Sequence, residues 1–254
     1  MRILWTFCIY NEIELLPFKI DYIVKNNIDC YVFDNMSTDG TWEWLQENKV
    51  PSERFDSDNM FNLKLNIKLI AEKIYEVKPN WTIFAGCDIF YANKENKTLR
   101  QVIEEADSKS FNIINSAYRS LTFYYTGTEK SGIDPRLNYM FYIPGEIGHE
   151  RCIAKFCPDF KIVADRFKFE NMNTMKDPNF LFLHYHLRHD AKLRKTEQYV
   201  RRKKAWDLGL VPANWGSHYR KLVNEKIFVF NPKALADIRN SGMWKQIKNS
   251  VKRG

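Results

Sequence analysis

Strand-like and helical patterns alternate along residues 1–88, and this alternation constrains the fold more than any other feature of the sequence. Three unbroken apolar runs, "RILWTFCIY", "DCYVFD" and "WTIFAG", are typical of strands that are buried on both faces. Residues 13–24 and 63–77 carry apolar side chains at helical spacing, and residues 41–48 are expected to form a short helix. We therefore predict an α/β fold with a mostly parallel central sheet covered by helices.

Polar residues follow each of the three predicted strands. They are Asn11 and Glu12, Asp34 and Asn35, and, after Gly86 and Cys87, Asp88. The carboxyl ends of parallel strands share one edge of a sheet, and ligands of such sheets bind beyond that edge. The three clusters are therefore expected to meet at one ligand-binding edge.

The stretch after the second strand, "DNMSTDGT", holds more polar groups than a turn requires. A simpler alternative is a helix cap, in which Ser37 or Asp39 caps the helix that contains Trp42 and Trp44. Because a cap uses one side chain, we favour a ligand site.

The size and composition of the chain are those of a globular protein. With 254 residues and 44% apolar content, it can bury a large core as one α/β domain or two smaller ones. No apolar run is long enough to cross a bilayer, and "MRILWTFCIYNE" is interpreted as a core strand rather than a signal peptide. Five cysteines without a CxxC pair indicate free thiols in a reducing compartment, so we expect a cytoplasmic protein.

The positive charge is unevenly distributed. Much of the net charge of +8 falls after residue 187, in "RHDAKLRKTEQYVRRKK" and in a tail that ends "KNSVKRG". Solvated helix faces explain such runs without any function. The alternatives are attraction to an anionic ligand, to an acidic membrane surface or to nucleic acid.

The alternation becomes irregular in the second half of the chain. Residues 110–165 are rich in aromatic and turn-forming residues, which indicates irregular strands and loops over the same edge, with a strand or two after residue 151. "NFLFLHYHLRH" predicts one more strand. A basic helix over residues 190–207 and a helical region from residue 232 are expected to follow.

Four motifs give the chain a family resemblance. "YNE", "VFDNMSTDGT" and "WTIFAGCDIFY" resemble, in order and spacing, the motifs of inverting family-2 glycosyltransferases, which have the Rossmann-like GT-A fold. "LHYHLRH" is similar to a further motif in a subset of these enzymes. The resemblance covers residues 1–95 and part of residues 181–204. It implies a catalytic domain over residues 1–190, divided at residue 95 into donor-binding and acceptor-binding halves, with residues 191–254 as a basic helical extension packed on it.

The resemblance also implies a set of residues that bind the nucleotide-sugar, with a UDP-sugar favoured. These are Asn11, Glu12, Asp34, Asn35, Ser37, Asp39, Asn66 and Arg188.

A divalent cation is implied at Asp88, which matches the second Asp of the family's D-x-D motif. The first Asp is Gly86 here, so His184 is the candidate for a second ligand, and Mn²⁺ is favoured over Mg²⁺ because it accepts imidazole more readily. Alternatively no metal is needed, and Arg188 with neighbouring basic residues carries the phosphate charge. His184 and the nearby histidines could also hold zinc or be ordinary hydrogen-bonded histidines.

An inverting transferase needs a general base that deprotonates the acceptor hydroxyl. Asp165 and Glu150 are the candidates that we favour. Asp134 is a third, but it precedes Pro135 in a predicted turn, where capping explains it equally well.

The leading hypothesis is sugar transfer, with inversion, to a hydroxyl acceptor in glycan or polysaccharide synthesis. A relative that binds nucleotide-sugar without turnover is an alternative, since Gly86 breaks the D-x-D motif. A basic nucleic-acid-binding protein, or a glycosyltransferase that acts on modified DNA, would explain the positive charge. So would a lipid-linked acceptor approached at the cytosolic membrane face, with Trp206, Trp215 and Trp244 at the interface.

Overall fold

The structure is a computed structural model. It describes residues 1–114, 120–123, 132–138, 141–142, 153–163, 166–168, 170–177, 179–185, 191–210, 236–237, 239 and 244–253. The four cysteines within these ranges, Cys8, Cys30, Cys87 and Cys157, are free thiols. No helix in the described ranges is long and apolar enough to cross a bilayer.

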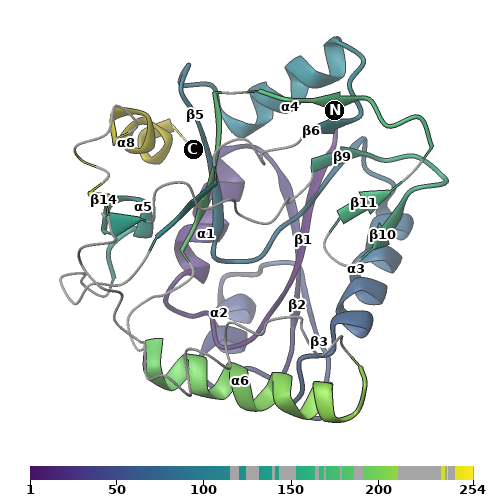
Figure 1. Ribbon diagram of the computed structural model, residues 1–254, viewed down its shortest axis with the longest axis vertical. Helices are drawn as coiled ribbons and strands as arrows, with labels where there is room; N and C mark the ends of the chain where they lie inside the picture. Colours follow the sequence, from purple (N-terminus) through teal and green to yellow (C-terminus); the bar gives the residue numbers. More distant parts are fainter. Residues whose placement is uncertain are drawn as a thin grey trace.

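A seven-stranded sheet forms the centre of the molecule (Figure 1). Its order is β12 (Thr174–Met175), β6 (Ile113–Ile114), β9 (Ile153–Lys155), β4 (Trp81–Phe84), β1 (Ile3–Ile9), β2 (Asp29–Asp34) and β3 (Ser52–Arg54). Strands β4, β1, β2 and β3 are parallel, β12 is parallel to β6, and β9 runs antiparallel to both of its neighbours. The predicted mostly parallel sheet is confirmed.

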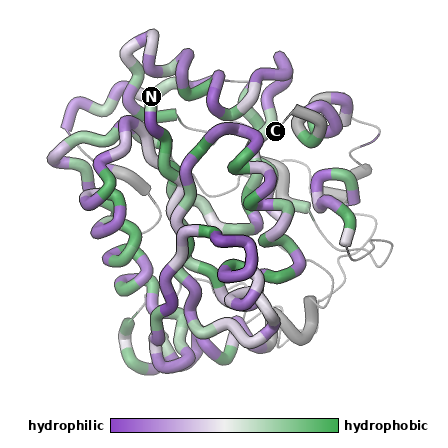
Figure 2. The backbone as a smooth tube through the Cα atoms, turned by 180° about the vertical axis from the view of Figure 1, so that it is seen from behind, coloured by the Kyte–Doolittle hydropathy of each residue, from purple (hydrophilic) through white to green (hydrophobic). Residues whose placement is uncertain are grey.

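The helices that connect these strands are α1 (Leu16–Lys25), α2 (Thr41–Glu47), α3 (Leu63–Val77) and α4 (Leu99–Ser108). Alternate residues of β1 contribute to two separate cores. Leu4 joins a cluster with Ile70 and Ile74 of α3, whereas Trp5 joins a cluster with Ile23 of α1. The alternation of hydrophobic and hydrophilic residues along the helices fits this one-sided packing (Figure 2). Helices α1, α2 and α3 were predicted correctly, whereas α4 was not predicted. Val24, which we expected on the buried face of α1, is exposed.

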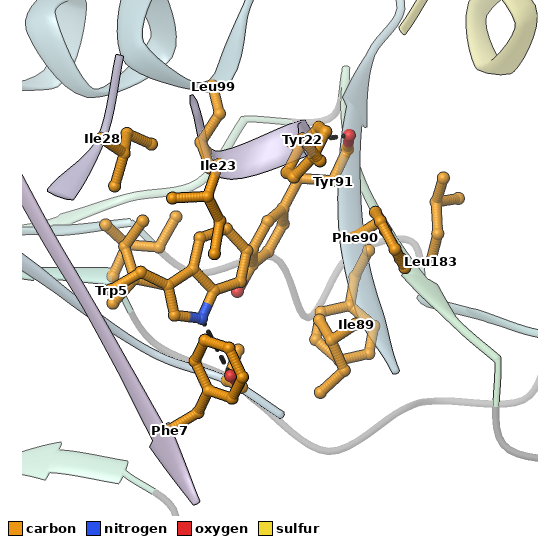
Figure 3. Packing of buried hydrophobic residues seen from close by; sticks show 14 of the residues in the cluster. Trp5, Phe7, Tyr22, Ile23, Ile28, Ile89, Phe90, Tyr91, Leu99 and Leu183 are labelled. Atoms are coloured by element: carbon orange, nitrogen blue, oxygen red, sulfur yellow. Dashed lines mark hydrogen bonds between the residues drawn. The ribbon is translucent and has the colours of Figure 1, made fainter. Parts of the chain in front are cut away.

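A second sheet continues from the end of the first. It has three strands, β5 (Ile89–Asn93), β13 (Phe180–His184) and β7 (Ser120–Thr122), with β13 in the middle. An aromatic core joins the two sheets (Figure 3): Trp5 donates a 2.8 Å hydrogen bond to the carbonyl of Ala85, and the hydroxyl of Tyr22 donates to the carbonyl of Tyr91. The chain is therefore fixed against β1 at Ala85 and against α1 at Tyr91, within β5.

The remaining elements are α5 (Pro135–Asn138), β8 (Phe141–Tyr142), β10 (Lys161–Val163), β11 (Arg166–Lys168), α6 (Ala191–Asp207), β14 (Ala236–Asp237) and α8 (Trp244–Arg253). Helix α6 confirms the predicted basic helix, and β9 and β10 are the strands expected after residue 151. The expected helical region from residue 232 was wrong at Ala236–Asp237, and its first four residues lie outside the described ones. A short strand, β14, pairs there with β8, and the helix begins at Trp244.

Candidate functional site

The loops after β1 and β2 are joined by hydrogen bonds between side chains and backbone. The N–H of Asn11 donates to Ser37 Oγ at 2.9 Å, and the N–H of Thr38 donates to Asn11 Oδ1 at 2.9 Å. The N–H of Glu12 donates to the hydroxyl of Thr41, also at 2.9 Å. Two of the three predicted polar clusters therefore meet at one edge of the sheet, where their hydroxyl and amide groups hold the two loops together.

Asp39 has a similar bridging role. Its carboxylate accepts the N–H groups of Ile13 at 3.2 Å and of Thr41 at 3.0 Å. The N-cap of α2 is Gly40, with a φ of 93°, and no side chain caps this helix. The alternative in which Ser37 or Asp39 is the N-cap was therefore wrong, although Asp39 does fix the turn that leads into the helix.

Asp34, at the end of β2, is fully buried. Its Oδ2 accepts the N–H of Ser37 at 3.1 Å and lies 3.2 Å from Nε of Arg54. Its Oδ1 is also buried and has no hydrogen-bond partner in the described part of the chain. Burial raises the pKa of Asp34, and the hydrogen bonds to Ser37 and the charge of Arg54 oppose that rise.

Two asparagines near Asp34 differ in how their amides are used. Asn35 is satisfied on both sides, because its Nδ2 donates to the carbonyl of Met60 and its Oδ1 accepts the hydroxyl of Ser57. Asn66, on the first turns of α3, is equally buried, but its Oδ1 has no partner among the described residues. Asn66 therefore retains an unused acceptor, whereas Asn35 supports the loop.

Asp88 and His184 come together although they are 96 positions apart in the sequence. Asp88 precedes β5 and His184 ends β13, and these strands pair antiparallel. Oδ2 of Asp88 lies 3.2 Å from Nε2 of His184, and the carbonyl of Asp88 accepts the N–H of Tyr185. Both side chains are partly exposed, at 25% and 16%, so the pair is open to a ligand.

The surroundings of this pair suit a cation that takes most of its ligands from elsewhere. Among the residues that the structure describes, no group of three His, Cys, Asp or Glu side chains surrounds a point. A Cβ atom at Gly86 would lie 2.9 Å from Oδ1 of Asp88, so an Asp at position 86 would displace this carboxylate. The carboxylate and the imidazole fit Mn²⁺ if diphosphate oxygens complete its shell.

Lys19, which sequence reasoning did not single out, is buried, and the charge of Asp88 acts on it. Its Nζ donates to the carbonyl of Ile89 and lies 3.4 Å from the ring centroid of Trp5. Burial lowers the pKa of Lys19, and the charges of Cys87 and Asp88 oppose this. The signal was present in the sequence, because position 19 lies on the apolar stripe of α1.

Arg201 on α6 also reaches this edge of the sheet. It is buried, its guanidinium stacks on the ring of Tyr10, and Asp34 is one of the groups whose charge acts on it. We had expected Arg188 to supply the positive charge. Arg188 lies outside the described residues, and Arg201 was missed because an arginine within a basic run looks like a solvated one.

The proposed bases are not placed by the structure. Asp165 and Glu150 lie outside the described residues, as do His186 and His189. Asp134 is described, and its carboxylate accepts the N–H of Arg136 and pairs with the buried Arg136 side chain at 2.8 Å. The capping alternative for Asp134 is confirmed.

Neither family models nor curated proteins match this sequence, whereas solved structures do. S. aureus TarS 1–349 in complex with UDP overlaps at a TM-score of 0.44 and 12% identity, covering 89% of this chain and 70% of that one. TarS 1–349 in a structure without a named ligand overlaps at 0.43 and 11% identity, covering 100% and 89%. The complex with UDP-GlcNAc overlaps at 0.34 and 14% identity, covering 56% and 39%. Overlaps this loose support no conclusion about function, which must come from the side chains at the sheet edge.

Proposed function

We propose that this protein is a GT-A glycosyltransferase that moves a sugar from a nucleotide-diphosphate sugar, with a UDP-sugar favoured, to a hydroxyl acceptor with inversion. The observation that carries the proposal is the contact between Asp88 and His184. The family resemblance calls for a carboxylate at this strand end, and a distant segment supplies an imidazole beside it. A structural pair of this kind has no evident need to stay open to solvent.

The nucleotide end of the donor is expected at Asp34 and Asn66. Each has a buried Oδ1 that accepts no hydrogen bond from the described residues. A buried acceptor without a partner costs about 1–3 kcal/mol, so such atoms are seldom retained unless a ligand or water satisfies them. Ribose hydroxyls and base N–H groups are suitable donors.

The diphosphate is expected at Asp88 and His184. A divalent cation, with Mn²⁺ favoured, would be held there and would neutralise the charge that develops on the departing nucleoside diphosphate. Gly86 leaves room for the carboxylate of Asp88 to adopt its present position. Lys19 holds the adjacent backbone in place, because its Nζ donates to the carbonyl of Ile89.

In the proposed reaction the acceptor oxygen attacks the anomeric carbon of the sugar and forms a new C–O bond. The bond between that carbon and the diphosphate oxygen breaks, and the nucleoside diphosphate leaves with the bonding electrons. The acceptor proton passes to a carboxylate, for which Asp165 and Glu150 remain our candidates. The acceptor would be a glycan or a lipid-linked hydroxyl compound.

A nucleic-acid-binding module is less well supported. Of the basic residues that suggested it, Arg201 is buried against Tyr10, and Arg202 lies over the ring of Phe61. Lys203 is paired with Asp207 on the same helix. These contacts use the arginines to pack α6 on the sheet edge.

The test is thermal unfolding with UDP, GDP, CDP and TDP, each with and without Mn²⁺. A nucleotide at about a hundred times its dissociation constant adds about 2.7 kcal/mol, which raises the unfolding temperature by about 5–10 °C for a chain of this size. We expect one nucleotide to give this shift in wild type, and the Asp88→Ala variant to lose the part that needs Mn²⁺.

Asp21→Ala is the matched control, because Asp21 is a half-exposed carboxylate paired with Lys25 on the surface of α1. It should retain the full shift. If no nucleotide raises the unfolding temperature, the transferase proposal is excluded. If a nucleotide raises it equally with and without Mn²⁺ and in Asp88→Ala, the donor site is supported and the metal site is rejected.

A further inference from the structure

Helix α6 lies across the carboxyl edge of the sheet, where β1 and β2 end (Figure 1). The N–H of Phe61 donates to the carbonyl of Arg201, and Nζ of Lys204 donates to the carbonyl of Asp58 at 2.6 Å. These bonds join α6 to the loop between β3 and α3, next to Asn66. The C-terminal basic segment is thus part of the same edge as the proposed donor site.

Arg201 points from α6 into this edge and is only 5% exposed. Its Cζ lies 3.4 Å from the ring centroid of Tyr10, the residue after β1. Its Nη2 donates at 3.1 Å to the carbonyl of Met60, which also accepts the amide of Asn35. The guanidinium therefore sits between Tyr10, after β1, and the loop that joins β3 to α3.

One donor of this guanidinium is unused. Nε of Arg201 is buried and has no hydrogen-bond partner in the described ranges. Burial lowers the pKa of Arg201 to about 10, with the charges of Tyr10, Glu197 and Asp34 among those that oppose the fall, so the side chain remains charged at neutral pH. A buried cation with an unused donor is costly unless something completes its shell.

Asp34, Asn66 and Arg201, here called the edge cluster, share this feature. Each is at least nine-tenths buried, and each has one polar atom without a partner among the described residues: Oδ1, Oδ1 and Nε. They come from β2, α3 and α6, three separate parts of the chain. Together they offer two acceptors and one donor.

This combination suits a nucleoside better than a phosphate. A phosphate group has only acceptor oxygens and is repelled by the carboxylate of Asp34. A nucleoside has ribose hydroxyls and base N–H groups for the two acceptors, and carbonyl or ring acceptors for Nε of Arg201. The phosphates belong instead near Asp88 and His184.

We propose that Arg201 binds the nucleoside part of the donor, so that α6 supplies one side of the donor site. This rests on the proposed function. Under this proposal the basic helix α6 contributes to nucleotide recognition and need not be a surface for another macromolecule. The base of the nucleotide would be read partly by a residue more than a hundred positions beyond the motif region of residues 1–95.

The test uses titration calorimetry with two probes in the presence of Mn²⁺: inorganic pyrophosphate, and UDP or whichever nucleoside diphosphate wild type binds in the unfolding assay. The variants are Arg201→Met, Arg201→Lys and, as a charge-matched control on the exposed side of α6, Lys203→Met. We expect Arg201→Met to weaken nucleotide binding by about tenfold or more, because a hydrogen bond from a charged group is lost. Arg201→Lys should also bind more weakly, and Lys203→Met should match wild type.

Pyrophosphate, which lacks the nucleoside, distinguishes loss of nucleoside recognition from a structural change that weakens binding of both probes. Its affinity should be the same in all four proteins, whereas a purely structural role of Arg201 would lower both affinities. The inference would be overturned if Arg201→Met binds the nucleotide within twofold of wild type, or if its affinity for pyrophosphate falls by the same factor. Either result would leave the proposed function standing. If Arg201→Met does not fold, the same criteria apply to Arg201→Lys. Failure of wild type to bind any nucleoside diphosphate would overturn the proposed function and this inference with it.

Discussion

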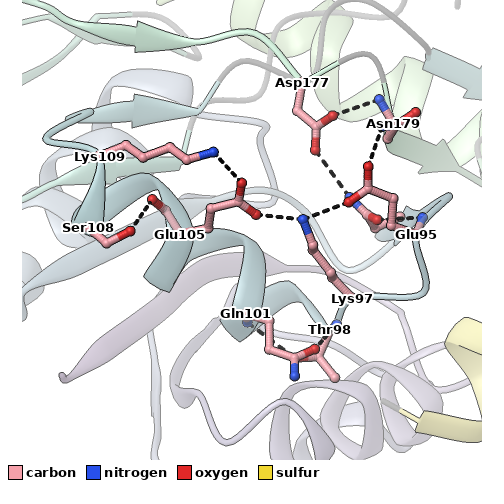
Figure 4. Close-up of polar contacts among 10 residues, drawn as sticks. Glu95, Lys97, Thr98, Gln101, Glu105, Ser108, Lys109, Asp177 and Asn179 are labelled. Atoms are coloured by element: carbon pink, nitrogen blue, oxygen red, sulfur yellow. Dashed lines mark hydrogen bonds and ion pairs between the residues drawn. The ribbon is translucent and has the colours of Figure 1, made fainter.

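Two groups of polar residues in this molecule contrast in burial and in pairing. The edge cluster is buried, and each member keeps an atom without a partner in the described structure. The surface network, formed by Glu95, Lys97, Glu105 and Lys109 (Figure 4), is partly exposed and paired throughout. Lys97 lies 2.6 Å from Glu95 and 2.7 Å from Glu105, and Lys109 lies 2.6 Å from Glu105.

The contrast separates the groups that we propose bind a ligand from groups that stabilise the fold. Unsatisfied buried atoms lower stability, so their presence points to a function outside folding. Paired groups at the surface are screened by water and contribute little in either direction. Removing a side chain from the edge cluster should therefore change binding, and removing one near the surface network should change stability alone.

The largest effect is expected from Asp34→Asn, which removes the negative charge of the edge cluster and keeps the shape of the side chain. Nucleotide affinity should fall by about tenfold or more, because an acceptor for the ligand is weakened. Stability at pH 7 should change little, because relief of the buried charge opposes the loss of the ion pair with Arg54. Calorimetric binding and urea unfolding of both proteins measure the two quantities.

The pH dependence gives a second signature of the same substitution. Between the ordinary pKa of an aspartate, near 3.8, and the raised pKa in the fold, the folded state holds more protons than the unfolded state. The free energy of unfolding of wild type should therefore fall as pH rises through this window, and Asp34→Asn should lack that fall. A variant that loses stability at pH 7 but binds nucleotide normally would place Asp34 with the structural residues.

A smaller effect is expected from Thr98→Ala at the start of α4, beside the surface network (Figure 4). Thr98 and Gln101 form a capping box, in which each side chain accepts the backbone N–H of the other. Loss of this cap should lower the free energy of unfolding by about 1 kcal/mol. Nucleotide affinity should not change, and a change larger than twofold would show that the two regions are coupled.

The smallest effect is expected from Glu105→Gln in the surface network. The side chains of Lys109 and Lys97 hold the pKa of Glu105 at about 2, compared with a usual value of 4.5. The folded state then holds fewer protons than the unfolded state, so this stabilisation is present above pH 4.5 and is lost as pH falls towards 2. Because about a third of the side chain is exposed, we expect about 0.5 kcal/mol.

Acid titration of unfolding in wild type and in Glu105→Gln measures this contribution. The sign is opposite to that of Asp34, whose contribution falls with rising pH. If both variants shift the pH profile in the same direction, the distinction between the two groups does not hold.

The fold was predictable wherever local pattern and burial agree. The strands β1 and β4 and the second half of β2 are mostly buried and mostly apolar, and α1 and α3 carry one apolar stripe each. The second sheet was not predicted, because pairing of β5 with β13 is a contact between distant segments that leaves no local pattern. Val24 was wrongly assigned to the buried face of α1, because the spacing of apolar residues does not determine how wide that face is. The division into catalytic domain and extension remains a prediction.

The residues of the candidate site were predictable where a motif stands at a strand end. Asp34 and Asp88 were found this way, and His184 through a family resemblance. Lys19 and Arg201 were missed because charged side chains are usually exposed to solvent. Their burial depends on Trp5 and Tyr10, which lie in other parts of the fold. Sequence spacing can place a lysine on an apolar stripe, but it cannot show which carbonyl accepts its hydrogen bond.

The pairing of β5 with β13 has a consequence for the order of assembly. A ribosome releases the amino-terminal strands first, so β1, β2 and β4 can associate while the rest of the chain is still being made. The imidazole partner of Asp88 is translated 96 residues later, and Arg201 later still. A nascent chain that ends before β13 has its parallel strands but neither of these groups, so nucleotide binding that depends on them can begin only after most of the protein has been synthesised.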